Sequence, residues 1–225
     1  MPEHLRLSPV ADAVVTLTLE RAEKKNALSI ALRDEVTAAL GALAADPQVK
    51  AVVITGAGDV FTAGFDLGEF KQAAADPAFR RRLWESSDRF HAACLGFPLP
   101  LLAAVNGPAI AGGFDLAVMC DVRVAARTAT FSHPEIAFGD VVYSPLHDLV
   151  GGAVARELCL TGRVVGAEEA LRLRLVSSVV PPGELAAETA RVAAMITRAP
   201  REVLLRTKAK IVRRAGVATG ATLDL

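Results

Sequence analysis

Apolar residues recur along the chain in two patterns, which predict strands alternating with helices. Residues 13–19 alternate in period two and are rich in β-branched side chains, while residues 51–55 and 101–105 are apolar throughout, as in strands covered on both faces. Between these runs, apolar side chains return every three or four positions in residues 29–46 and 76–94, which is the spacing of one helix face.

The second half of the chain continues this alternation. Two short strands are predicted at residues 121–126 and 129–132, and helices at 146–160, 184–198 and 200–214. Because strands separated by helices tend to pair in parallel, the whole pattern predicts an α/β fold built from layered βαβ units.

Two of the predicted strands run into turns that contain glycine. Residues 101–105 lead to Gly112 and Gly113 at the start of an apolar, helix-like segment, and residues 51–55 lead to the segment 60–67. Backbone N–H groups at such a helix start are unpaired and lie at the positive end of the helix dipole, where they can hold a developing negative charge. The sequence therefore predicts an oxyanion site, such as one for a thioester oxygen, with one donor from each junction.

Other interpretations of residues 98–121 fit less well. A membrane span would leave Asn106, Asp115 and several glycines unpaired in lipid. A phosphate-binding loop needs Lys and then Ser or Thr after its last glycine, where Phe114 and Asp115 stand, and the glycines lack the spacing of a dinucleotide fingerprint. Glycines that serve only close packing remain an open alternative.

Charge and cysteine content narrow the function classes. The 25 basic and 25 acidic residues cancel, so neither nucleic acid nor a membrane is expected as a partner. The three cysteines are widely spaced in apolar surroundings and are expected as reduced core thiols, and no C-x-x-C, H-E-x-x-H or G-x-S-x-G motif occurs. Since the charged N-terminus has no apolar signal core, we expect a cytoplasmic protein.

Three ordered motifs carry a family resemblance. Residues 61–67 correspond to F-x-A-G-x-D-L, residues 106–116 to N-G-x-A-x-G-G-G-x-E-L, and Pro134-Glu135 to a P-E pair twenty residues beyond the carboxylate of the second motif. From about residue 10 onward the chain resembles the enoyl-CoA hydratase/isomerase (crotonase) superfamily.

The resemblance implies an architecture and an assembly. We expect a crotonase-like spiral of repeated β-β-α units over residues 1–183, followed by a C-terminal helical region over residues 184–225 that is shorter than usual in the family. Family members also imply a homo-oligomer, either a trimer or a dimer of trimers.

The same resemblance implies an acyl-CoA thioester substrate, with no separate cofactor because coenzyme A is part of that substrate. The backbone N–H groups of Ala63 and Gly112 would polarise the thioester carbonyl as it becomes an enolate, and Glu135 with Asp115 would move the protons. The candidates for contact with coenzyme A are Lys24, Lys25, Ala27, Ala63, Asp66 and Leu67. The candidates for an acyl pocket are Phe138, Tyr143 and His147.

Two departures from the family pattern bear on the reaction. Asp115 stands where hydratases carry Glu, so its reach is about 1.5 Å shorter, and we expect Glu135 to be the principal acid/base with Asp115 in support. Residues 139–149 replace a glycine-rich segment. Both hydration and isomerisation of an enoyl-CoA stay open, as do a decarboxylase or hydrolase using Tyr143 or His147 and a non-catalytic member that binds acyl-CoA or a protein. Neither His133 nor His147 has a partner that the sequence can place, so no metal site is expected.

Overall fold

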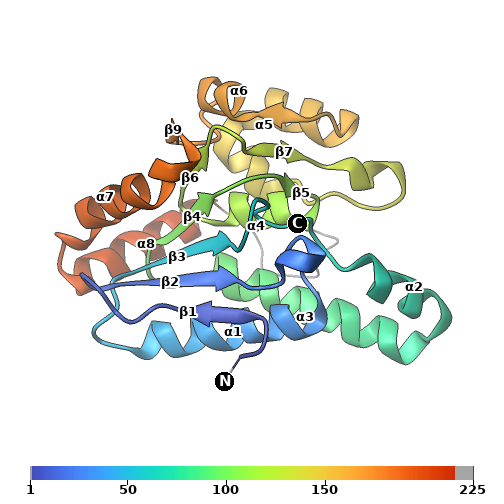
Figure 1. Cartoon of the computed structure of the whole chain (residues 1–225), viewed down its shortest axis with the longest axis horizontal. Coiled ribbons are helices and arrows are strands. Elements are labelled where there is room, and N and C mark those ends of the chain that lie inside the picture. The colour runs from blue at the N-terminus through green and yellow to red at the C-terminus, as the bar shows by residue number, and fades with distance from the viewer. Residues whose placement is uncertain (1, 216–224) are drawn as a thin grey trace.

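The main sheet of the protein is largely parallel. The computed structural model describes residues 2–215 and Leu225. Six strands lie in the order β1-β2-β3-β4-β6-β9, with β1 antiparallel to β2 and all other neighbours parallel (Figure 1). The predicted α/β class is confirmed. The strands are Leu5–Leu7 (β1), Val14–Leu19 (β2), Ala51–Gly56 (β3), Leu101–Val105 (β4), Val122–Ala126 (β6) and Ser178–Val180 (β9).

A small second sheet stands beside the first. It consists of Ala109–Ile110 (β5), Thr130–Ser132 (β7) and Val165–Gly166 (β8), with β5 parallel and β8 antiparallel to β7. Since β5 ends two residues before helix Gly112–Met119 (α4), and β7 ends just before the loop that contains Glu135, this sheet fixes the start of both segments.

Helices cover both faces of the main sheet. Helices Ile30–Ala45 (α1), Pro77–Leu95 (α3) and α4 contribute to the larger core on one face, and Leu185–Thr197 (α7) packs on the other (Figure 1). The other helices are Leu67–Ala75 (α2), Ser144–Thr161 (α5), Ala167–Arg172 (α6) and Arg201–Ala215 (α8), and the 3-10 turns are Ala22–Lys24 (η1), Pro134–Ala137 (η2) and Pro182–Glu184 (η3).

The continuous apolar runs reflect this double cover. Along β3, Val52 and Ile54 belong to the larger core, while Ala51 and Val53 belong to the core beneath α7. Both sets of side chains are therefore buried. For this reason β3 lacks the alternate polar residues of a strand that has one face in solvent.

Local signals account for the helix boundaries. Ser29 Oγ accepts a hydrogen bond from Leu32 N at 3.3 Å at the start of α1, and Asp76 caps α3 by accepting from Ala78 N at 2.8 Å. The predicted helix over 146–160 appears as α5, which is kinked at Gly151, where φ is 77°.

The C-terminal helical region is described through Ala215 and at Leu225. Its helix α7 covers the sheet, and the buried Lys208 of α8 pairs with Asp121 at 2.5 Å. The part of the predicted region over 216–224 lies outside the described residues. No helix in the described ranges is both long enough and apolar enough to cross a membrane.

Candidate active site

The segment between β3 and α2 forms the first side of the site. The N–H of Ala63 is used within the protein, because it donates to the carbonyl oxygen of Lys25 at 2.9 Å. The prediction that Ala63 supplies an oxyanion donor is corrected by this hydrogen bond. Two residues further on, the next backbone N–H that can face a ligand is that of Phe65.

Phe65 and Gly112 bring two backbone segments together. A methyl group placed on Gly64 would lie 2.9 Å from Gly112 N, and one placed on Gly112 would lie 3.7 Å from Phe65 N. Within the described residues neither the Phe65 N–H nor the Gly112 N–H has a hydrogen-bond acceptor. Gly112 begins α4, so its N–H also lies at the positive end of a helix dipole. These two groups form a candidate oxyanion hole.

A buried arginine braces the first of these segments. Arg33 of α1 is fully buried, and its Nη1 donates to Leu28 O at 2.9 Å while its guanidinium lies 4.3 Å from the centre of the Phe65 ring. Leu28 in turn donates its N–H to Gly64 O at 2.8 Å. Arg33 therefore contacts the Gly64-Phe65 turn through both a backbone chain and a ring face.

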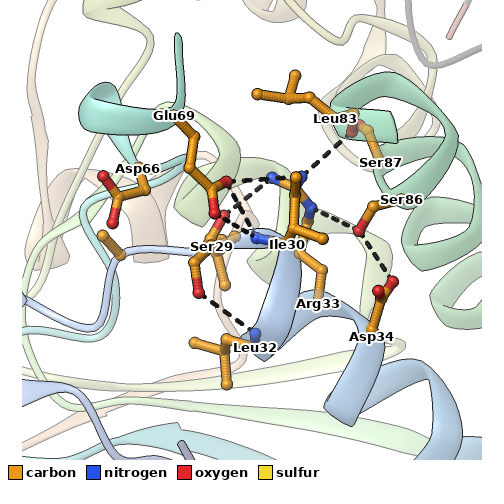
Figure 2. A network of polar contacts seen from close by, with 12 residues as sticks. Ser29, Ile30, Leu32, Arg33, Asp34, Asp66, Glu69, Leu83, Ser86 and Ser87 are labelled. Atoms are coloured by element: carbon orange, nitrogen blue, oxygen red, sulfur yellow. Dashed lines mark hydrogen bonds and ion pairs between the residues drawn. The ribbon is translucent and has the colours of Figure 1, made fainter. Parts of the chain in front are cut away.

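The charge of Arg33 is compensated from α2 and α3. Figure 2 shows its guanidinium between Glu69, at 4.0 Å, and the Leu83 carbonyl, to which Nη2 donates at 3.2 Å. The Glu69 carboxylate also accepts from Ile30 N, so it ties the start of α2 to the start of α1. Burial lowers the pKa of Arg33 to about 10 and raises the pKa of Glu69.

Two carboxylates and one imidazole form the second side of the site. Asp115 lies in the first turn of α4 and Glu135 lies in η2, and both are largely buried. His133 lies between them, with Nδ1 at 2.9 Å from Glu135 Oε1 and 3.8 Å from Asp115 Oδ1. The sequence could not place a partner for His133, and the structure gives it contacts with both carboxylates.

Burial dominates the electrostatics of this cluster. It raises the pKa of Asp115 to about 7, with a smaller opposing effect from His133. Burial also opposes a charge on His133, but the hydrogen bond to Glu135 and the charges of both carboxylates outweigh it and raise the pKa of the imidazole. A buried carboxyl group that titrates near neutrality is suited to acid/base work.

The shifted pKa of Asp115 predicts a pH-dependent stability. The folded protein holds this proton up to about pH 7, whereas the unfolded chain releases it near pH 3.8. The free energy of unfolding should therefore decrease as the pH rises from about 3.8 to about 7. Asp115→Asn removes the buried charge. It should raise the free energy of unfolding by about 1–3 kcal/mol at pH 8 and change it little at pH 5.

Denaturant unfolding of both proteins at the two pH values measures this difference. Glu23→Gln, at an exposed carboxylate, is the matched control and should give the same small change at both pH values. An Asp115→Asn effect that is equal at pH 5 and pH 8 would contradict a buried, titrating Asp115.

The predicted contacts for coenzyme A fall into two groups. Lys24 and Lys25 are exposed, whereas Ala27, two residues after Lys25, is buried. Asp66 is engaged within the protein, because it accepts from Gly68 N at 2.9 Å and from Arg21 at 3.2 Å, and Leu67 is exposed. The lysines are free to meet a ligand phosphate, whereas Asp66 caps α2.

The predicted acyl-pocket residues are spread over one loop. Phe138 is 75% exposed, and the Tyr143 ring lies 5.4 Å from the exposed His147 in a tilted arrangement. Tyr143 donates its N–H to Leu225 O at 2.9 Å. This loop lies between η2 and α5, so it follows Glu135 directly along the chain.

The same cluster offers three donors to a cation. One ligand atom each from Asp115, His133 and Glu135 lies within 4.8 Å of the others. However, the hydrogen bond from His133 to Glu135 already accounts for their close approach, and a structural zinc site would need a fourth donor. We therefore assign no metal to these residues.

Sequence reasoning missed three residues of this site. Phe65 was missed because the donor was assigned to Ala63, two positions earlier. Arg33 was missed because it lies in the helix predicted over residues 29–46, where a polar residue on the solvent face is ordinary. His133 carried a signal, since it directly follows the predicted strand over 129–132 and stands two residues before Glu135. Its contact with Asp115 depends on tertiary packing.

Comparisons with known proteins match the chain to one family. The family described as Enoyl-CoA hydratase/isomerase matches residues 10–223. The chain is 35% identical to a crotonyl-CoA hydratase of Syntrophomonas wolfei over 82% of this chain and 72% of that protein. It is 32% identical to the mitochondrial enoyl-CoA hydratase domain-containing protein 3 of Mus musculus, over 90% of this chain and 68% of that one.

Solved structures give the same result for the fold. An enoyl-CoA hydratase/isomerase from Xanthobacter autotrophicus superposes with a TM-score of 0.89 at 32% identity, covering 96% of this chain and 81% of that one. An enoyl-CoA hydratase from Mycobacterium tuberculosis superposes with a TM-score of 0.81 at 34% identity, covering 94% and 90%. The predicted crotonase-like fold is thereby confirmed.

Proposed function

The chain belongs to the enoyl-CoA hydratase/isomerase family, and on that premise we propose that it binds an acyl-CoA thioester and stabilises the enolate formed from it. The observation that carries this proposal is the pair of N–H groups at Phe65 and Gly112, which have no acceptor among the described residues. Asp115 lies in the same first turn of α4 as Gly112 and forms one cluster with Glu135. Two donors aimed at one oxygen stabilise the charge that develops there, and losing one donor typically costs about 3 kcal/mol in the transition state.

Proton transfer falls to the carboxylates in this proposal. Glu135 is the principal acid/base, since its Oε2 is buried and has no hydrogen-bond partner among the described residues, and Asp115 supports it. Hydration of the enoyl double bond needs one group to take a proton from water and one to give a proton to carbon, while isomerisation needs one base that serves two carbons. The cluster can serve either reaction, so the proposal covers both.

Substrate binding would use the exposed cations. Lys24 and Lys25 lie on η1 and just after it, next to the Ala63 segment, where they can meet the phosphates of coenzyme A. Coenzyme A enters as part of the substrate, and the proposed chemistry uses no other cofactor. We extend the proposal to a homo-oligomer, either a trimer or a dimer of trimers, which sedimentation equilibrium would test.

A substrate panel tests the proposed function. Purified protein is incubated with crotonyl-CoA, a 3-enoyl-CoA and a malonyl-type CoA ester, and the products are followed by mass spectrometry. A 3-hydroxyacyl or 2-enoyl product supports the proposal. Release of carbon dioxide or free coenzyme A would replace it by decarboxylation or hydrolysis, and tight binding without turnover of any ester would replace it by a non-catalytic role.

A further inference from the structure

His133 is the least expected member of the cluster. It follows β7 directly and is 1% exposed, and its ring stacks on Phe114 with centroids 4.6 Å apart. Its Nε2 is buried and has no hydrogen-bond partner in the described part of the chain. All of its polar contacts therefore run through Nδ1, which faces both carboxylates.

We propose that His133 is a positioning residue that makes the two carboxylates unequal: its Nδ1–H holds Glu135 as the ionised base, and Asp115 keeps the proton and serves as the acid. The inference rests on the function proposed above and deepens it. It assigns the two proton-transfer roles that the motifs leave open.

The geometry separates the two carboxylates. The 2.9 Å contact between Nδ1 and Glu135 Oε1 is a hydrogen bond, whereas the 3.8 Å contact to Asp115 Oδ1 is too long for one. A carboxylate that accepts from an imidazole is stabilised in its ionised form. The bond also occupies Oε1 and fixes the ring, so Oε2 of Glu135 is left to meet the substrate.

Charge balance places the proton on Asp115. A buried cluster is most stable when its net charge is smallest, and an imidazolium with one ionised and one protonated carboxyl sums to zero. Asp115 is the more deeply buried acid, with 8% of its side chain exposed against 13% for Glu135. It is also the acid that lacks the short hydrogen bond, so it is the one that stays protonated.

The groups that face His133 come from three further elements. Glu135 approaches from η2 and Asp115 from α4, and the Cys159 thiol of α5 lies close enough to both carboxylates for their charges to act on it. Burial, then the two carboxylates, raises the pKa of Cys159 to about 11. The thiol therefore stays neutral and leaves the charge balance to the other three groups.

The roles assigned to Glu135 and Asp115 account for every proton that moves in either reaction. In hydration, Glu135 takes a proton from water as the water oxygen bonds to the β-carbon, the π electrons move to the thioester oxygen, and Asp115 protonates the α-carbon as the carbonyl reforms. Glu135 ends protonated and Asp115 ionised, and proton exchange with water after product release restores the starting state. In isomerisation, Glu135 takes the α-proton and returns it to the γ-carbon, with no net change at the site.

Two substitutions separate positioning from packing. His133→Leu keeps a side chain of similar size against Phe114 but has no hydrogen-bond donor. His133→Asn keeps an N–H donor close to the position of Nδ1 but cannot carry a charge. We expect His133→Leu to lower kcat by about 10–100-fold with KM within about threefold, and to move the acid limb of the pH–rate profile to higher pH. His133→Asn should recover part of kcat, and His4→Asn should match the wild type.

Several outcomes would overturn the proposal. These are a His133→Leu protein with the kcat and pH profile of the wild type, a His133→Asn protein no more active than His133→Leu, or a stoichiometric metal ion in the purified wild type that is lost in His133→Asn. If His133→Leu does not fold, His133→Asn decides, because its acid limb should still lie above that of the wild type. An unchanged acid limb would contradict the role.

A titration without turnover separates this proposal from the proposed function. In ¹⁵N spectra of labelled imidazoles, the pKa of His133 should fall in Glu135→Gln, because the neutral amide no longer stabilises the imidazolium. An equal pKa in both proteins would overturn the inference even if the enzyme is active. A lower pKa of His133 in Glu135→Gln, together with no turnover of any CoA ester, would support the interaction between His133 and Glu135 but contradict the proposed enzymatic function.

Discussion

Glu135→Gln should lower kcat for the enoyl-CoA substrate by about 10²–10⁴-fold, which is the range for loss of a general acid/base. The amide preserves the shape of the side chain and can still accept from His133 Nδ1, so the 2.9 Å contact and the fold should persist. What is lost is the capacity of Oε2 to take a proton. KM should change by no more than a few-fold, because the backbone N–H groups and the lysines proposed to bind the substrate are untouched.

Steady-state kinetics and a melting curve on the same preparation check this result. Glu184→Gln, at an exposed carboxylate of η3, is the control and should retain the wild-type kcat. A Glu135→Gln protein that is fully active would remove Glu135 from the chemistry and leave Asp115 as the acid/base. One that is inactive with a lowered melting temperature would instead point to a structural role.

The long elements of the fold could be predicted from the sequence, because a short stretch of residues is enough to reveal a strand that is buried on both faces or the cap of a helix. The runs at β3 and β4 and the helices over 29–46 and 76–94 were predicted with correct types and nearly correct bounds, and in the structure Ser29 and Asp76 cap those two helices. The two-residue strands β5 and β8 could not be predicted, since so short a segment has no periodicity and is defined only by its partner β7.

Helix α2 was missed for a different reason. It directly follows the predicted oxyanion segment, and only Ala73 among its residues is buried, so no apolar face marks it. Its position depends on Asp66 at its N-cap and on Glu69, which reaches Ile30 N and Arg33 across the network in Figure 2. These contacts join residues about forty positions apart, which a single sequence does not reveal.

The same distinction applies to the site. Motif spacing correctly indicated that Asp115 and Glu135 belong together, because their segments follow β5 and β7, which are neighbouring strands of one sheet. The prediction of a donor at Ala63 was wrong, because the direction of an N–H group depends on backbone dihedrals that differ between Ala63 and Phe65. Gly64, with φ of 82°, turns the chain between these residues, so Ala63 faces Lys25 and Phe65 faces Gly112.

Gly64→Ala should therefore impair both stability and catalysis. Its added methyl group would lie 2.6 Å from Ile110 O and 2.9 Å from Gly112 N, and the residue would have to hold a positive φ. The backbone conformation costs about 1–2 kcal/mol, and the overpacking adds about 1–3 kcal/mol. Relief of the clash separates the two segments, and a displacement of about 1 Å at the oxyanion hole can cost on the order of a hundredfold in kcat.

Gly151→Ala separates the two contributions, because Gly151 has a nearly equal φ of 77° but nothing within 4 Å of an added methyl group. Its φ of 77° and ψ of 164° lie in a region that residues other than glycine rarely adopt, so it should lose about 1–3 kcal/mol of unfolding free energy and keep the wild-type kcat. Denaturant unfolding and kcat measured on both variants test the comparison. If Gly64→Ala lost stability but kept its kcat, the close approach of the two segments would serve packing alone, and the Phe65 and Gly112 N–H groups would not be the donors that hold the enolate.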